Sequence, residues 1–163
     1  MAKSTFSGPI RSKAGVFSAG SDSIVSLTAD TTLTVDAHAG RILTTNDADG
    51  KFTLPTIIAS PLRVEVNNLG STYTFFVETA ATDLDIKTDG TDKFVGGLYT
   101  GKDDATGKTF IAAASNDVIT LNGSTKGGLA GSIIRVTAVA DNKYAVEGII
   151  LGSGTIVTPF ADA

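Results

Sequence analysis

The stretch that most constrains the fold is residues 132–151, SIIRVTAVADNKYAVEGIIL. Two arms rich in Ile and Val flank the polar residues 141–143, which is typical of two β-strands joined by a tight turn. A three-residue loop places these apolar residues on one face: Ile134, Val136, Ala138, Tyr144, Val146 and Ile150. It leaves Arg135, Thr137 and Glu147 on the other face, whereas a two-residue loop mixes the faces, so the pattern favours the longer loop. One apolar face needs a cover, so the rest of the chain is expected to supply strands that pack on it.

Short strands are predicted along the rest of the chain, because apolar and polar residues alternate from Ile24 onward. The predicted strands are 24–29, 32–36, 41–45, 51–54, 62–67, 72–78, 84–87, 94–99, 109–113, 118–121, 132–139, 143–151 and 155–158. Pro55 and Pro61 mark an edge piece or crossover, and residues 78–83 could form one short turn of helix. Strands at this spacing, separated by Gly- and Asp-rich turns, predict an all-β fold: an antiparallel β-sandwich or a jelly-roll-like barrel.

Composition limits the classes of function. The 163 residues include no Cys, which excludes a disulfide framework and a thiolate zinc site. The net charge is −4, and Lys and Arg are scattered rather than gathered in a basic stripe, so no nucleic-acid partner is expected. The apolar runs are too short for a membrane span, and the N-terminus lacks the apolar core of a signal peptide. We therefore expect no membrane association, and a protein made and kept, or assembled, in a cytosol.

The first 23 residues differ from the rest, so the expected organisation is an N-terminal extended arm at 1–23 and a β-sandwich domain at 24–163. Apolar residues occur singly in the arm among Ser, Gly and Lys, and all its charges except that of Asp22 are positive. Such a segment cannot build a core of its own. It is either a disordered tail or an arm that docks on a partner through Phe6, Ile10 and Phe17, with a reach of about 75 Å when fully extended.

No catalytic, metal or cofactor site is predicted. His38 is the only histidine, lies in an expected turn, and has no nucleophile motif to serve. Residues 46–50 resemble the start of a calcium loop, but position 12 of that loop, counted from Asp47, is Ile58 rather than Glu. The glycine pairs at 96–97 and 127–128 do not form a phosphate-binding motif. Glu residues are few, which argues against a glycosidase pair.

Five phrases carry a family resemblance: STFSGPIRS at 4–12, GKFTLP at 50–55, TYTFFV at 72–77, DVITL at 117–121 and NKYAVEG at 142–148. In their order along the chain they resemble the small structural proteins of marine and cyanobacterial tailed phages. Tyr144 stands where that pattern has Trp, and Pro61 stands where it has Gly. The resemblance implies a capsid decoration (cement) protein, a β-sandwich or jelly-roll module that sits on the outer shell, commonly as a trimer.

The resulting hypothesis is a non-enzymatic protein of the virion, on the outer capsid surface, assembled in the host cytoplasm. Its expected partners are the major capsid protein and further copies of itself. The candidate capsid-binding residues of the arm are Phe6, Pro9, Ile10, Arg11 and Phe17. The candidate self-association residues, on the less apolar face of the 132–151 hairpin, are Arg135, Val139, Glu147 and Ile149. Arg135 and Glu147 are expected to lie near each other diagonally on this face. The alternatives are a receptor- or glycan-binding module of a phage fibre or tail, and a small hydrolase, which the absent motifs make improbable.

Overall fold

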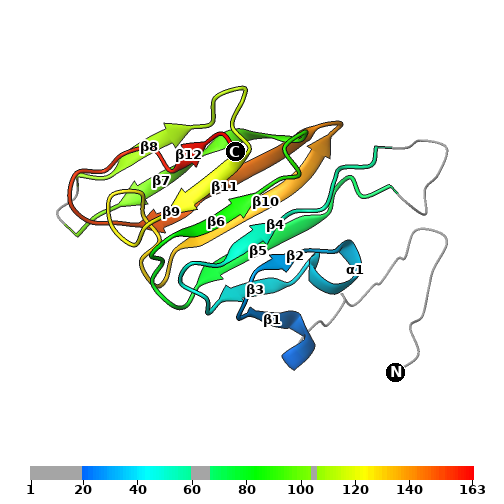
Figure 1. Cartoon of the computed structure of the whole chain (residues 1–163), viewed down its shortest axis with the longest axis horizontal. Coiled ribbons are helices and arrows are strands. Elements are labelled where there is room, and N and C mark those ends of the chain that lie inside the picture. The colour runs from blue at the N-terminus through cyan, green and yellow to red at the C-terminus, as the bar shows by residue number, and fades with distance from the viewer. Residues whose placement is uncertain (1–19, 60–66, 104–105) are drawn as a thin grey trace, which may run out of the picture.

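Two facing β-sheets make up the part of the chain that the computed structural model describes, residues 20–59, 67–103 and 106–163 (Figure 1). The large sheet has the order β1 (Ile24–Leu27), β3 (Ile42–Thr45), β5 (Thr72–Val77), β10 (Ile133–Ala140), β11 (Lys143–Leu151), β7 (Lys93–Gly101) and β8 (Lys108–Ile111). The small sheet has the order β12 (Phe160–Ala161), β9 (Val118–Leu121), β6 (Leu84–Lys87), β4 (Lys51–Thr53) and β2 (Thr31–Thr32). Two short helices, η1 (Ser21–Ser23) and α1 (Val35–His38), precede β1 and β3. The prediction of an all-β sandwich is confirmed.

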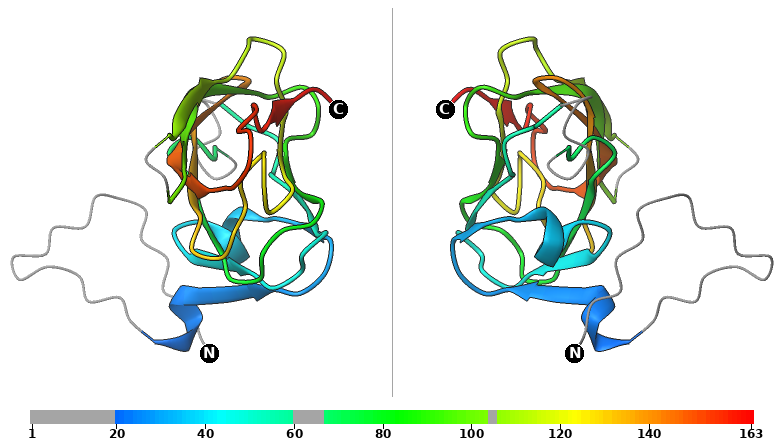
Figure 2. Two further views of the ribbon diagram at one scale, coloured as in Figure 1. Left: turned by 90° about the vertical axis from the view of Figure 1, so that its left-hand side faces the viewer. Right: turned by 90° about the vertical axis from the view of Figure 1, so that its right-hand side faces the viewer.

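The first six strands alternate between the two sheets. As a result, β1, β3 and β5 run parallel in the large sheet, and β2, β4 and β6 run parallel in the small one. Parallel neighbours need a crossover between them, and here the strand in the opposite sheet supplies it. Five strand pairings are antiparallel, as the sequence suggested, and five, including that of β7 with β11, are parallel. Both sheets are therefore mixed rather than antiparallel throughout. Figure 2 shows β1, drawn in blue, at the opposite end of the molecule from the C-terminus.

The core lies between the two sheets. Phe52 of β4 and Phe75 of β5 are fully buried, and their ring centroids lie 6.3 Å apart, which ties one sheet to the other. The six residues predicted for the inner face of the hairpin are all buried, which confirms that part of the prediction. Tyr144 is among them, and its hydroxyl donates to the Pro55 carbonyl oxygen at 2.6 Å.

The loop of the hairpin was predicted wrongly. Ala140 pairs with Lys143, so the turn has two residues, and the second of them, Asn142, has a positive φ of 56°. A β-bulge between Ala138 and Ala140 shifts the register by one residue and returns the apolar side chains to a single face. The extra residue inside the strand therefore keeps the apolar side chains on one face, which is the effect predicted for a three-residue loop.

Three other predictions of secondary structure are corrected. Residues 35–38 form a helical turn rather than the end of a strand, because the Thr34 hydroxyl caps the Ala37 amide. Residues 155–158 are an extended loop, and the last strand is β12. Residues 78–83 are not helical; the amides of Ala81 and Thr82 instead donate to carbonyl oxygens of neighbouring loops. The predicted strand 62–67 lies almost wholly outside the described residues.

The segment that follows Pro55 is a crossover held by buried polar groups. The Asp92 carboxylate accepts from the Ile57 amide at 2.8 Å, and the Asn68 side chain accepts from the Ile58 amide at 2.7 Å. The Asn68 amide group also donates to the Thr56 carbonyl oxygen at 2.8 Å. These bonds satisfy backbone groups that no sheet ladder reaches.

Candidate interaction surface

The outer face of the large sheet is the most apolar surface of the described chain. Of twelve exposed large hydrophobic residues, eight lie on this face: Ile24, Ile42, Val95, Tyr99, Ile111, Ile133, Val139 and Ile149. Single exposed hydrophobic residues are ordinary on a protein surface, but a contiguous group marks a contact site. We therefore name these eight residues the apolar face.

Part of this surface is a row of apolar side chains that crosses four neighbouring strands. Ile133 pairs with Phe76 on one side and with Ile149 on the other, and Ile149 pairs in turn with Tyr99. Ile133 and Ile149 are 46% and 56% exposed, so neither is covered within the chain. Because neighbouring strands lie about 4.8 Å apart, these side chains form a continuous apolar ridge.

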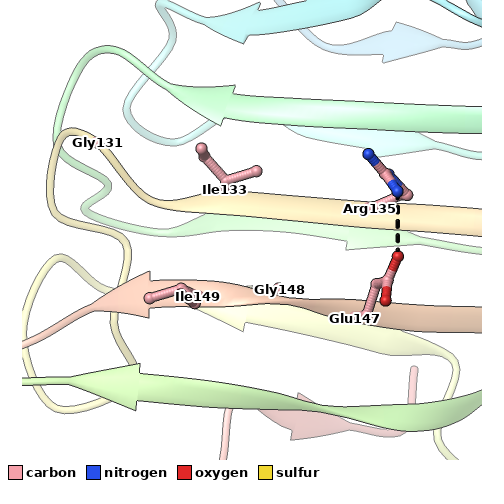
Figure 3. A pocket seen from close by; sticks show the side chains of 6 residues that line it. All are labelled: Gly131, Ile133, Arg135, Glu147, Gly148 and Ile149. Atoms are coloured by element: carbon pink, nitrogen blue, oxygen red, sulfur yellow. Dashed lines mark hydrogen bonds and ion pairs between the residues drawn. The ribbon is translucent and has the colours of Figure 1, made fainter.

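One ion pair interrupts the apolar face. Arg135 pairs directly with Glu147 across β10 and β11, with a distance of 3.3 Å between Nη1 and Oε1 (Figure 3). The two residues were expected to lie diagonally, and the bulge brings them opposite each other. Both side chains are more than half exposed, so the pair contributes at most about 1 kcal/mol to folding. Its charges remain available to a partner.

Two shallow hollows flank this ion pair. One, of about 520 Å³, is lined by Gly131, Ile133, Arg135, Glu147, Gly148 and Ile149 (Figure 3). The second, of about 420 Å³, lies on the other side and includes Val95, Val139 and Gly96. Gly96 has a positive φ of 108°, and a Cβ there would lie only 2.4 Å from the Val146 carbonyl oxygen, so no larger residue can fill that hollow.

The outer face of the small sheet is polar by contrast. Lys51, Asp85 and Thr120 stand side by side on three neighbouring strands, and Thr53 and Lys87 form the adjacent row. The Lys51 ammonium lies 3.0 Å from the Asp85 carboxylate, a cross-strand pairing of opposite charges. A surface of this composition is suited to water rather than to a protein partner.

The structure brings together all four candidate self-association residues. Arg135, Val139, Glu147 and Ile149 lie on the outer face of the same hairpin. Sequence reasoning missed their neighbours Tyr99, Val95, Phe76, Ile24 and Ile42, because strand order decides which segments lie beside the hairpin. The alternation of Val95, Gly97 and Tyr99 in one predicted strand was the available signal. The five candidate residues of the arm, Phe6, Pro9, Ile10, Arg11 and Phe17, lie outside the described residues.

Burial and hydrogen bonds shift the pKa of several side chains in the described part of the chain. Burial acts to raise the pKa of Asp117, but hydrogen bonds from Lys93 and from the Ala163 amide outweigh it and hold that pKa below its ordinary value. Burial raises the pKa of Asp92, although the bond from Ile57 opposes the shift. Burial likewise raises the pKa of Tyr73 to about 12.

Within the described ranges, His38, Asp and Glu side chains form no group of three that could hold a metal ion. His38 lies on α1, where its Nδ1 accepts from the Thr34 amide at 2.9 Å. Nor does any helix in that part of the chain have the length and apolar character to cross a membrane.

Comparison with known proteins gives no relative: no family model, no curated protein and no solved structure matches this chain. The candidate surface therefore has to be interpreted from its own chemistry.

Proposed function

We propose that this chain is a non-catalytic structural protein that decorates and stabilises a phage capsid. The observation that carries the proposal is the contrast between the two outer faces of one sandwich, an apolar large-sheet face and a charged small-sheet face. A cement protein needs a rigid body with one face for its partners and another for water. The phrases shared with small structural proteins of tailed phages point to the same class.

In this proposal the apolar face mediates self-association, with the hairpin at its centre. Burying Ile149 and Val139 against another copy stabilises the contact by about 2 kcal/mol for each side chain. Arg135 and Glu147 stand between two hollows that a neighbour's side chains can fill. The expected assembly is a trimer on the outer surface of the virion, formed in the host cytoplasm.

The N-terminal arm supplies the contact with the major capsid protein. Phe6 and Phe17 each gain about 2 kcal/mol on burial, which offsets part of the entropy cost of ordering the residues that make the contact. Pro9, Ile10 and Arg11 complete the proposed contact. Many copies on a closed shell raise the effective concentration of every bridging contact, so each one can be modest.

The test is the position and copy number of the chain on the virus particle, determined by cryo-electron microscopy. We expect density for the sandwich on the outer capsid surface, at a copy number that follows the capsid symmetry. A few copies at a fibre or tail tip would contradict the proposal and favour the receptor- or glycan-binding alternative. A second test removes residues 2–20: the truncated protein is expected to fold and to lose capsid binding, and unimpaired binding would exclude the arm's role.

A further inference from the structure

The large sheet ends in two open edge strands. β1 forms one margin and β8 the opposite margin (Figure 1). Each has four residues, whereas the edge strands of the small sheet, β2 and β12, have two. Long open edges are templates for pairing with another chain, and proteins usually shorten, charge or cover them.

The outward backbone groups of β1 belong to Ile24 and Ser26. The Leu27 carbonyl oxygen accepts from the Asn46 amide at 2.9 Å, so the backbone groups of Leu27 face β3. Those of successive residues in a strand face opposite sides, so Ile24 and Ser26 face away from β3. Among the described residues no hydrogen bond reaches these outward backbone groups. β1, with the sequence IVSL, carries no charge or proline that would protect it.

The outward groups of β8 belong to Thr109 and Ile111. The Ala112 amide donates to the Gly96 carbonyl oxygen at 3.0 Å, so the even-numbered residues of this segment face β7. Thr109 and Ile111 consequently face the margin, and in the described part of the chain nothing is bonded to their backbone groups there. β1 and β8 therefore each have two alternate residues whose outward backbone groups could form hydrogen bonds with a strand of another chain.

Charge favours pairing of β1 with β8 over pairing of β1 with itself. Asp22 and Asp30 flank β1, and both are exposed. In an antiparallel pairing of two β1 strands, each end of the contact would hold Asp22 of one copy, from η1, and Asp30 of the other, whose carboxylate accepts from the Lys51 amide at 2.8 Å, and these like charges would repel. β8, with the sequence KTFI, contains no carboxylate, and its Lys108 ammonium, which donates to the Ile156 carbonyl oxygen at 3.1 Å, adds a positive charge at the start of the strand.

The apolar face continues across such a contact. Ile24 and Ile42 stand side by side at the β1 margin, and Ile111, 78% exposed, stands at the β8 margin on the same face. Pairing would set Ile111 of one copy beside Ile24 of the next. It would cover the most exposed large hydrophobic residue of the described chain.

We propose that β1 of one copy pairs with β8 of the next, so that the large sheets of neighbouring copies join edge to edge. The contact is heterologous, and such contacts generate closed rings when their rotation closes. It rests on the proposed self-association and adds an edge contact to the one made by the hairpin. Its partner is a second copy of this chain.

Cross-linking tests the pairing directly, since the chain has no Cys of its own. Ile24→Cys and Ile111→Cys proteins, one of them carrying a size tag, are mixed and treated with a short bismaleimide. We expect a mixed cross-linked dimer in the mixture and little product from either protein alone. Val157→Cys, which is exposed in the loop before β12, is the matched control for random collision.

Two outcomes would overturn the edge contact. A dominant 24–24 product would show β1 pairing with itself, and a 24–111 yield no higher than that of the Val157→Cys control would show that these edges do not meet. Sedimentation of the same samples separates this failure from that of the proposed function. If the protein forms an oligomer without the 24–111 product, only the proposal of edge pairing is excluded. The cryo-electron microscopy test decides the capsid role.

A proline variant provides a second measurement. Ser26→Pro removes an outward amide and leaves the ladder to β3 intact, a position at which edge strands tolerate proline. We expect association to weaken about fivefold to tenfold, the effect of one lost hydrogen bond. The urea midpoint should match that of Ser26→Ala, because both variants lose the bond from the Asn46 side-chain amide to the Ser26 hydroxyl. Ser26→Ala keeps the amide and is expected to associate like the wild type. Equal association of the proline and alanine variants would contradict the proposal.

Discussion

The two outer faces of this sandwich are built on the same scaffold and carry opposite chemistry. On the large sheet, Ile133, Ile149 and Tyr99 stand in one row across neighbouring strands. On the small sheet the corresponding place is taken by Lys51 and Asp85, which neutralise each other. Both sheets bury side chains on their inner faces, so the core does not require the difference between the outer faces. That difference is the basis of the proposal that the large sheet meets a partner and the small sheet meets solvent.

The largest expected effect separates the inner from the outer face within a single strand. Phe75 is fully buried and Phe76, the next residue of β5, points to the apolar face. Phe75→Ala is expected to lower the free energy of unfolding by about 3–5 kcal/mol, because it leaves a cavity between the sheets. Phe76→Ala should cost about 1 kcal/mol or less in a monomer. Urea denaturation of both variants measures the difference, and equal losses would show that Phe76 belongs to the core.

A smaller effect is expected at the partly buried ion pair of Lys93 and Asp117. Lys93 opens β7 in the large sheet, and its ammonium lies 2.6 Å from the Asp117 carboxylate beside the small sheet. Asp117→Asn removes a charged hydrogen bond and is expected to cost about 2 kcal/mol at neutral pH. Thermal unfolding or urea denaturation measures the loss.

The pH dependence of that loss follows from the lowered pKa of Asp117. A carboxyl whose pKa is lower in the folded state contributes stability above its unfolded pKa, and this contribution disappears as the pH falls through the folded value. The gap between wild type and Asp117→Asn is therefore expected to be widest above the ordinary value of 3.8 and to close below it. A gap that persists unchanged well below that pH would assign the loss to packing instead.

Changes to the exposed Arg135–Glu147 pair should affect self-association rather than stability, the reverse of what is expected for the Lys93–Asp117 pair. Arg135→Glu sets two carboxylates opposite each other on the apolar face, yet it is expected to change the stability of the monomer by less than about 1 kcal/mol because both side chains are solvated. Its effect should appear in self-association, which sedimentation measures. Glu147→Arg is the reciprocal variant, and the double exchange should restore part of the association. An oligomer left intact by either single exchange would contradict the role of this pair.

Local pattern predicted much of this fold. The alternation in residues 132–151 identified the inner face of the hairpin from Ile134 to Ile150, because burial on one side of a strand imposes a period of two. It did not predict the bulge near Ala138, since a bulge and a longer loop give the same alternation. The Arg135–Glu147 pairing was misplaced for the same reason.

The order of the strands in the two sheets could not be predicted from the sequence. Along the chain, the parallel neighbours β1, β3 and β5 are separated by strands of the other sheet. The residues of a strand do not by themselves indicate which strand will pair with it. The apolar face was therefore recognised only where it crosses the hairpin, at Val139 and Ile149. Tyr99 and Ile42 joined it through pairings that span many residues of intervening chain. The extent of the candidate interaction surface therefore depends on topology, while its centre could be predicted from local sequence.

The central claim, that the apolar face of the large sheet is the self-association surface, is tested most directly by sedimentation velocity of three proteins. These are the wild type, Ile149→Asp on the apolar face and the matched variant Thr120→Asp on the small-sheet face. We expect the wild type and Thr120→Asp to sediment as the same oligomer and Ile149→Asp to sediment as a folded monomer. An Ile149→Asp protein that sediments like the wild type would contradict the account.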